Sequence, residues 1–194
     1  GIDPVLSPDG QTVALTRWDG AEQGSLWTID IDGTNERVII SDLRKAKGPD
    51  WSPDGSQIVF NYQHEGRLEA KDVCYNLLKG EPPMPPFNAY SIRSEFDEEF
   101  TPYLCWTLPP DPHWGLRVVN LADGRSEDVD GGTYAFRPAW DPSQPWRIVS
   151  DGGQGLLGVD INRPEYRQNL TDNVKDSSPV FSPDGRYLAV TAGN

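Results

Sequence analysis

The sequence Pro49-Asp50-Trp51-Ser52-Pro53 shows a pattern that recurs along this chain of 194 residues: a proline, any residue, a large apolar residue, a serine or aspartate, and a second proline. Further copies occupy residues 4–8, 138–142 and 179–183, and a weaker copy occupies residues 100–102. Measured between their final prolines, successive copies are 45, 49, 40 and 41 residues apart. Such regular spacing indicates a structural unit that is built several times along the chain.

The residues after each motif predict that the unit begins with a β-hairpin. In three copies the motif continues into Asp-Gly, at residues 9–10, 54–55 and 184–185. A Ser-Pro-Asp-Gly run reverses the chain because proline presets φ, aspartate bonds the local backbone and glycine accepts positive φ. The segments that follow are short, apolar and rich in β-branched or aromatic residues, as strands should be: 12–16, 57–61 and 187–191.

Spacing and strand content together predict an all-β fold, a β-propeller of four-stranded antiparallel blades. Helical repeats of similar length would show long stretches of 3.6-residue periodicity, which the chain lacks. We expect one propeller region over residues 1–194 with about four and a half blades. The predicted bounds are 1–46 for blade 1, 47–97 for blade 2 with an insertion at 79–97, 98–135 for blade 3, 136–176 for blade 4 and 177–194 for a partial blade 5.

Both ends of the sequence carry the first two strands of a blade, so neither end supplies the outer strands that would close a ring. We therefore expect a propeller that is continued by further sequence or completed by another chain. The alternative is an unusual five-bladed ring with a two-stranded last blade. A third interpretation is a structural subunit that assembles through open blade edges.

Residues 51–60 and 181–190 resemble the WD40-like PD40 repeat of TolB-like β-propellers. The resemblance covers nearly the whole chain apart from residues 79–97. Two turns depart from the repeat, because other residues replace Asp-Gly: Tyr103-Leu104 and Ser143-Gln144. The resemblance implies a repeat protein of the periplasm or the extracellular space that binds a protein, peptide or glycan partner.

Composition narrows the partners. A formal net charge of −13 and a pI near 4.4 argue against nucleic acid or an anionic membrane surface, because both favour lysine and arginine. No segment approaches the ~18 apolar residues of a membrane span. The acidic segment 30–36 has oxygen ligands for calcium but lacks the EF-hand spacing, so a hairpin turn explains it better. We expect neither a cofactor nor a metal.

Cys74 and Cys105 are the two cysteines of the chain. They fall on adjacent predicted blades, where a disulfide of an exported protein and two buried strand thiols both fit, and we favour free thiols. Two cysteines without neighbouring histidines do not make a closed zinc site. Asn169 begins a formal glycosylation sequon, but the repeat itself predicts the same letters.

Candidate catalytic residues are few. His64 and His113 stand in turn-like surroundings and are predicted to be surface or turn residues. No Gly-x-Ser-x-Gly elbow is present, so the sequence lacks the signature of the hydrolase domain that follows related propellers in prolyl oligopeptidase-like enzymes. We expect no enzymatic activity from this chain.

The predicted insertion is where the sequence departs from its repeat. A proline-rich run around Met84 and Phe87 should be stiff and extended, and an acidic stretch follows it. Loops on rigid scaffolds often carry function, so we predict a partner-docking site formed by Met84, Phe87, Tyr90, Glu95 and Asp97. The alternative is an elaborated connection that packs across a blade or the channel mouth.

The sequence therefore favours a non-catalytic interaction module of the cell envelope or extracellular space, which binds its partner through a propeller face or the 79–97 insertion. One alternative is the propeller portion of an exported serine peptidase whose catalytic domain lies elsewhere. Fold alone does not identify the partner.

Overall fold

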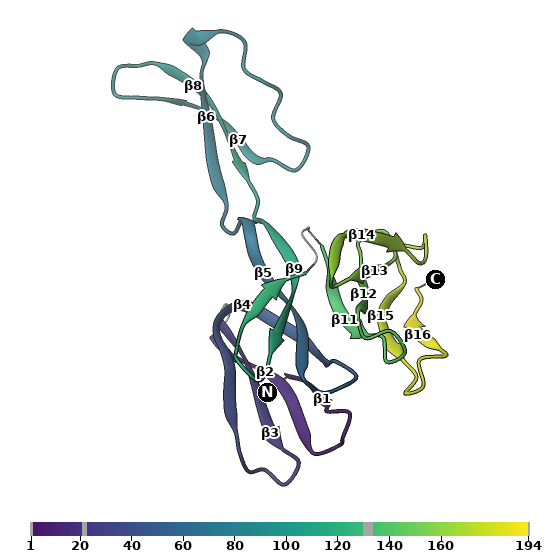
Figure 1. The fold of residues 1–194 in the computed structure, drawn as a ribbon. Helices are drawn as coiled ribbons and strands as arrows, with labels where there is room; N and C mark the ends of the chain where they lie inside the picture. Colours follow the sequence, from purple (N-terminus) through teal and green to yellow (C-terminus); the bar gives the residue numbers. More distant parts are fainter. Residues whose placement is uncertain (1, 21–22, 130–133, 194) are drawn as a thin grey trace. The chain divides into compact units, whose positions relative to one another are not determined.

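The computed structural model describes residues 2–20, 23–129 and 134–193, and these are predominantly β-strands. The strands, labelled in Figure 1, are β1 (Ile2–Leu6), β2 (Thr12–Asp19), β3 (Gln23–Asp30), β4 (Arg37–Trp51), β5 (Gln57–Arg67), β6 (Lys71–Asn76), β7 (Tyr90–Phe96), β8 (Pro102–Leu108), β9 (Asp111–Asn120), β10 (Ser126–Asp128), β11 (Phe136–Trp140), β12 (Arg147–Asp151), β13 (Leu156–Asp160), β14 (Arg163–Asn169), β15 (Ser177–Phe181) and β16 (Leu188–Thr191). A short 3₁₀ turn, η1 (Leu77–Lys79), follows β6. The predicted all-β class is confirmed.

The chain divides into two compact units. The first, here called the propeller unit, comprises Gly1–His64 and His113–Asn194, and the second, the insertion unit, comprises Glu65–Pro112. The insertion unit has a sheet of its own in the order β6-β8-β7 (Figure 1).

The described strands of the propeller unit form three antiparallel sheets. A seven-stranded sheet runs β1-β2-β3-β4-β5-β9-β10, and β11-β12-β13-β14 and β15-β16 form separate sheets. The long strand β4 serves two blades, because residues 37–44 pair with β3 and residues 44–51 pair with β5. Blade 1 is thus β1 to the first half of β4, and blade 2 is the second half of β4 with β5, β9 and β10.

The strand assignment in the middle of the chain differs from the prediction. The insertion extends over residues 65–112 instead of 79–97, and the structure divides the predicted blade 3 (98–135) between two sheets. β6 belongs to the sheet of the insertion unit, and the strand that pairs with β5 to continue blade 2 is β9. The weak copy at Pro102 has the right spacing but lacks the Ser-Pro-Asp-Gly turn, so the first hairpin of a blade does not begin there.

The predicted Ser-Pro-Asp-Gly turns form as their chemistry requires. In blade 2, Ser52 Oγ donates to Asp54 Oδ1 at 2.6 Å and accepts from the Gln57 backbone N–H at 2.9 Å. Gly55 has a φ of +71°, which favours glycine. The turn at Ser7 has the same geometry, whereas at residues 141–144 Asp141 accepts from the N–H groups of Ser143 and Gln144 instead.

The core lies between successive blades, and β5 is buried on both faces. Ile58 and Phe60 pack with residues of blade 1, and Val59, on the opposite face, packs with Trp140 and Ile148 of the next sheet. All three β5 side chains are completely buried. Successive strand residues point to opposite faces, so this apolar run is what a strand between two neighbouring sheets needs.

A second feature repeats in the innermost strand of every blade. The residue before the first proline of each motif has a left-handed φ between +46° and +54°, and the strand register is interrupted there: Asp3, Gly48, Arg137 and Ser178. A bulge of this kind turns the backbone N–H out of its own ladder.

The N–H group released by the bulge donates to the preceding blade. Gly48 N–H donates to Asp3 Oδ2 at 3.1 Å, and Arg137 N–H donates to Asn61 Oδ1 at 3.3 Å. Ser178 N–H donates to Asp151 Oδ1 at 2.7 Å. These inter-blade hydrogen bonds satisfy groups that would be costly to leave unpaired, and they join each of these innermost strands to the blade before it.

Replacing Asp151 with alanine is expected to destabilise the propeller unit by about 1–3 kcal/mol, because the half-buried Ser178 N–H loses its acceptor. Urea unfolding followed by tryptophan fluorescence measures the change. Asp172→Ala, which removes an exposed carboxylate between β14 and β15, is the control and should stay within about 0.5 kcal/mol of wild type. Equal stabilities of the two variants would contradict the inter-blade role.

Candidate functional site

The innermost strands β1, β4, β11 and β15 line a cavity of about 660 Å³, here called the axial groove. The prolines of all four motifs contribute to its walls, together with Trp51, Trp140 and Phe181. Leu6 and Val180 also line it and remain 50% and 61% exposed. Proline has no N–H group to offer, so the walls are apolar over most of their length.

A second cavity of about 630 Å³ shares Gly48 and Arg137 with the axial groove and is here called the polar mouth. Asp3, Lys47 and Asp151 line it, so both signs of charge are present. The Lys47 ammonium lies 5.1 Å from the ring centre of Trp18 and 5.7 Å from that of Trp114. Cation–π contacts of this kind hold the lysine between blades 1 and 2.

Arg137 lies where the two cavities meet. Its guanidinium donates to Asp151 Oδ2 at 3.3 Å and to Ser178 Oγ at 3.1 Å. Burial raises the pKa of Asp151, while the Ser178 N–H and Arg137 oppose the rise. The Arg137 guanidinium therefore already has hydrogen-bond acceptors inside the propeller unit.

Asp50 is the acidic side chain of the axial groove. Its Oδ2 accepts from the Trp140 backbone N–H at 2.7 Å, which joins blade 2 to the next sheet. Burial raises the pKa of Asp50 to about 6, although backbone N–H groups of Trp140 and Trp51 favour the charged form. A carboxylate whose pKa is shifted by burial in a cleft is a candidate for a functional group.

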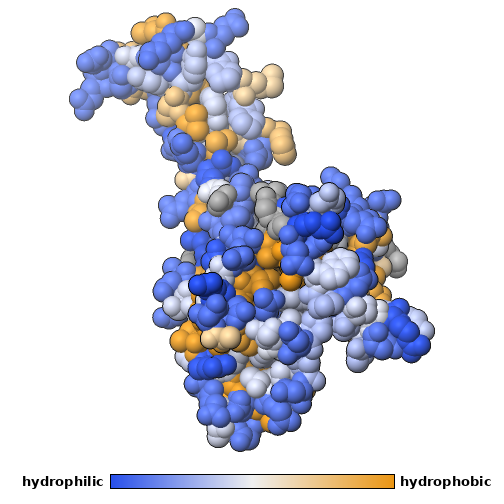
Figure 2. All heavy atoms as spheres, viewed as in Figure 1, coloured by the Kyte–Doolittle hydropathy of each residue, from blue (hydrophilic) through white to orange (hydrophobic). Residues whose placement is uncertain are grey.

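The insertion unit carries a second candidate surface. Of the predicted docking residues, Met84 and Phe87 are 90% and 102% exposed, and Tyr90 is also exposed. Other large apolar side chains of this unit, not singled out from the sequence, are exposed as well: Leu78, Ile92, Phe96 and Phe100. Figure 2 shows apolar surface in orange over the region that Figure 1 labels β6 to β8.

Glu95 and Asp97, the two acidic residues of the predicted docking site, are engaged within the insertion unit. Glu95 pairs with Arg93 on the same strand. Asp97 Oδ1 accepts from the backbone N–H groups of Glu99 at 3.0 Å and Thr101 at 2.8 Å, and such hydrogen bonds lower its pKa. Asp97 shapes the turn before β8.

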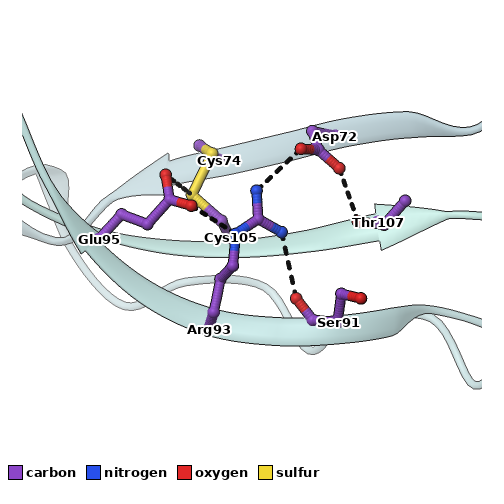
Figure 3. A network of polar contacts seen from close by, with 7 residues as sticks. All are labelled: Asp72, Cys74, Ser91, Arg93, Glu95, Cys105 and Thr107. Carbon is purple, nitrogen blue, oxygen red and sulfur yellow. Dashed lines mark hydrogen bonds and ion pairs between the residues drawn. A yellow bond between two sulfur atoms is a disulfide. The ribbon is translucent and has the colours of Figure 1, made fainter.

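Arg93 organises a polar network on one face of the three-stranded sheet, shown in Figure 3. Its guanidinium lies between Asp72 of β6, at 2.8 Å, and Glu95 of β7. Thr107 of β8 donates to the other Asp72 oxygen at 2.6 Å. The network connects all three strands of the insertion unit.

The expected free thiols are corrected, because Cys74 and Cys105 form a disulfide. They lie on β6 and β8 of the insertion unit and are directly opposite in the register, with Cα atoms 4.1 Å apart. Glu95 is close to both sulfur atoms, but disulfide sulfur is not a thiolate and does not supply the ligand a metal needs. The sequence alone separates the cysteines by 31 residues and gives no sign of this register.

The two histidines are in strands instead of the predicted turns. His64 of β5 and His113 of β9 have ring centres 6.4 Å apart, next to Tyr62. The predicted turn at residues 30–36 is confirmed, since Asp32 Oδ1 accepts from the Thr34 N–H at 2.9 Å.

Among the described residues, no helix is long and apolar enough to cross a membrane.

Comparisons with known proteins agree with the geometry. No protein-family model matches the sequence, so the PD40 assignment stays a prediction. The chain is 21% identical over 204 residues to the uncharacterized peptidase YuxL of Bacillus subtilis (strain 168), a match that covers 98% of this chain and 29% of that protein.

Solved structures show the same fold. A putative TolB from Agrobacterium tumefaciens has a TM-score of 0.60 at 14% identity, over 98% of this chain and 53% of that chain. Dipeptidyl peptidase 4 from Porphyromonas gingivalis has a TM-score of 0.53 at 14% identity, over 97% of this chain and 29% of that chain. The predicted TolB-like β-propeller fold is confirmed, and the chain spans about half of the TolB structure or less than a third of the peptidases.

Unfolding stability should depend on pH through Asp50. Its pKa is about 6 in the folded state against 3.8 as the reference, so the folded state holds a proton that the unfolded state has lost between these values. Stability contributed by Asp50 is therefore present below pH 4 and falls as pH rises through 6, by up to about 3 kcal/mol. Asp50→Asn should reduce this fall.

Urea unfolding at several pH values from 4 to 7.5 measures the dependence for wild type and Asp50→Asn. The difference between the two proteins isolates Asp50, because all other ionisable groups are the same in both. Stability curves that remain parallel over this range would show that Asp50 has no raised pKa.

Reducing the Cys74–Cys105 disulfide, or replacing both cysteines with serine, is expected to destabilise the insertion unit by about 3 kcal/mol, because the bond closes a loop in the unfolded chain. Hydrogen exchange with mass spectrometry should show faster exchange in residues 71–108, with the innermost strands of the propeller unit unchanged. Two free thiols in the unreduced, denatured protein would contradict the disulfide.

Proposed function

We propose that this propeller is a non-catalytic interaction module whose axial groove binds an extended peptide segment of a partner protein. The observation that supports this proposal is the groove itself, where four equivalent strands bring proline and aromatic walls together. A cavity of about 660 Å³ is in the usual size range for sites that bind small molecules or short segments.

The lining favours a peptide over a glycan. Sugar hydroxyl groups need hydrogen-bond partners when they leave water, and the groove offers few: Asp50, Arg137, Ser178 and Ser182 are its polar side chains among the described lining residues. Apolar and proline side chains of an extended peptide match the flat walls, as in other grooves that recognise proline-rich segments.

Periplasmic or extracellular residence is part of the proposal. The disulfide supports it, because such bonds persist mainly in oxidising compartments. The exposed apolar residues of the insertion unit offer a second contact for the same partner, with Met84 and Phe87 as its anchors.

A second candidate function is the propeller portion of an exported peptidase. The similarity to YuxL, which extends over 98% of this chain, favours it. The axial groove would then hold a substrate peptide for a catalytic domain encoded beside these residues. A Gly-x-Ser-x-Gly motif in the adjoining coding sequence, together with labelling of the whole gene product by a fluorophosphonate probe, would support this candidate over the first.

Selection from a random-peptide phage library on the 194-residue protein is expected to enrich extended, apolar sequences that bind in the axial groove. Binding of a selected peptide, measured by calorimetry, should weaken at least about tenfold in Val180→Arg, because the new side chain fills the groove at a cost of over 1.4 kcal/mol.

Val174→Arg is the matched control, because Val174 is 66% exposed and does not line the groove, and it should leave peptide affinity unchanged. The absence of any enriched peptide, or equal affinity for both valine variants, would overturn the groove as the binding site.

A further inference from the structure

The groove position held by Asp50 is apolar in the other repeats. Asp50 occupies the second place of its motif, and the same place holds Val5, Ala139 and Val180 in the other copies. All four residues line the axial groove. The fold therefore accepts a small apolar side chain here, and a carboxylate is a departure that the repeat does not require.

The hydrogen bond to Trp140 does not explain why the side chain at position 50 is a carboxylate. Asp50 accepts the Trp140 N–H, but the neutral amide of an asparagine has the same acceptor oxygen. A buried negative charge costs stability unless a cation or several donors compensate it. Burial raises the pKa of Asp50, which shows that the backbone donors do not compensate this cost fully.

No cation of the described residues pairs with Asp50. Two cations are relevant: Arg137 also lines the groove, and Lys47 is on the same strand, β4. Arg137 bonds Asp151 and Ser178, and Lys47 lies over the rings of Trp18 and Trp114. The carboxylate thus faces a cavity whose remaining walls are apolar or hydroxyl-bearing.

We infer that Asp50 is a receptor for a cationic group of the bound peptide, an ammonium or a guanidinium that enters the axial groove and pairs with the carboxylate between Trp51 and Trp140. This inference rests on the proposed function and names the class of its ligand: a peptide with a positive charge flanked by apolar residues. The net charge of −13 attracts such a ligand over long range.

The test uses acetylated and amidated heptapeptides that alternate proline and leucine around a central lysine, arginine or citrulline. Citrulline keeps the shape of arginine without its charge. A fourth peptide, with the central citrulline and a free amino terminus, distinguishes a terminal ammonium from a side-chain cation. Calorimetry at pH 7.5 in 50 mM salt gives the affinities for wild type, Asp50→Asn and the charge control Asp172→Asn.

Wild type is expected to bind the arginine or lysine peptide at least tenfold more tightly than the acetylated citrulline peptide. If the receptor takes a terminal ammonium, the free-amine citrulline peptide shows the preference instead. Either preference should fall to less than threefold in Asp50→Asn and persist in Asp172→Asn. Urea unfolding of Asp50→Asn establishes that it remains folded, so the loss is one of recognition.

Equal binding of charged and neutral peptides by wild type would overturn the inference and leave the proposed function intact, provided that Val180→Arg still weakens the binding. A charge preference that survives in Asp50→Asn would also overturn it. Failure of wild type to bind any of the four heptapeptides, or any phage-selected peptide, would overturn the proposed function and the inference together.

Discussion

The propeller unit depends on one backbone device, the left-handed residue before the first proline of each motif. The bulge at that residue releases an N–H group from its own sheet, and a side chain of the preceding blade accepts it. Because the acceptors differ, an aspartate, an asparagine and another aspartate, the backbone geometry is what repeats and the side-chain chemistry is adjusted around it. Each of these innermost strands is thereby joined to the blade before it, and the innermost strands together line the axial groove.

The same short motif serves three levels of structure. Its Ser-Pro-Asp-Gly end reverses the chain, its aromatic residue packs between blades, and its prolines form the groove walls. The insertion leaves this arrangement intact, because β9 returns beside β5 and completes blade 2 after 48 residues that fold as a unit of their own. A disulfide and the Arg93 network connect the strands of that unit to one another.

Local chemistry explains which parts of the fold are predictable. Ser52, Asp54 and Gly55 specify their turn within four residues, so the sequence predicts the first hairpin of a blade well. The pairing of β9 with β5 joins segments far apart in the chain, and the spacing of Pro102 from its neighbours imitates the repeat. The register that places Cys74 opposite Cys105 is hidden for the same reason. Met84 and Phe87 are exposed as expected, whereas Asp97 accepts a hydrogen bond from the Thr101 N–H and stabilises a turn.

Asp50 occupies the second place of its motif, where the sequence varies between the copies. The motif allows any residue at this place, so the motif alone gives it no role. The four copies line one cavity, however, and their residues at this place can be compared directly. Three copies have an apolar residue at this place and one carries a half-buried carboxylate, so the three apolar copies show what stability requires there. Folding therefore does not explain the cost of the charge at Asp50, which backbone donors offset only in part, and we infer that a cationic group entering the groove offsets the remainder.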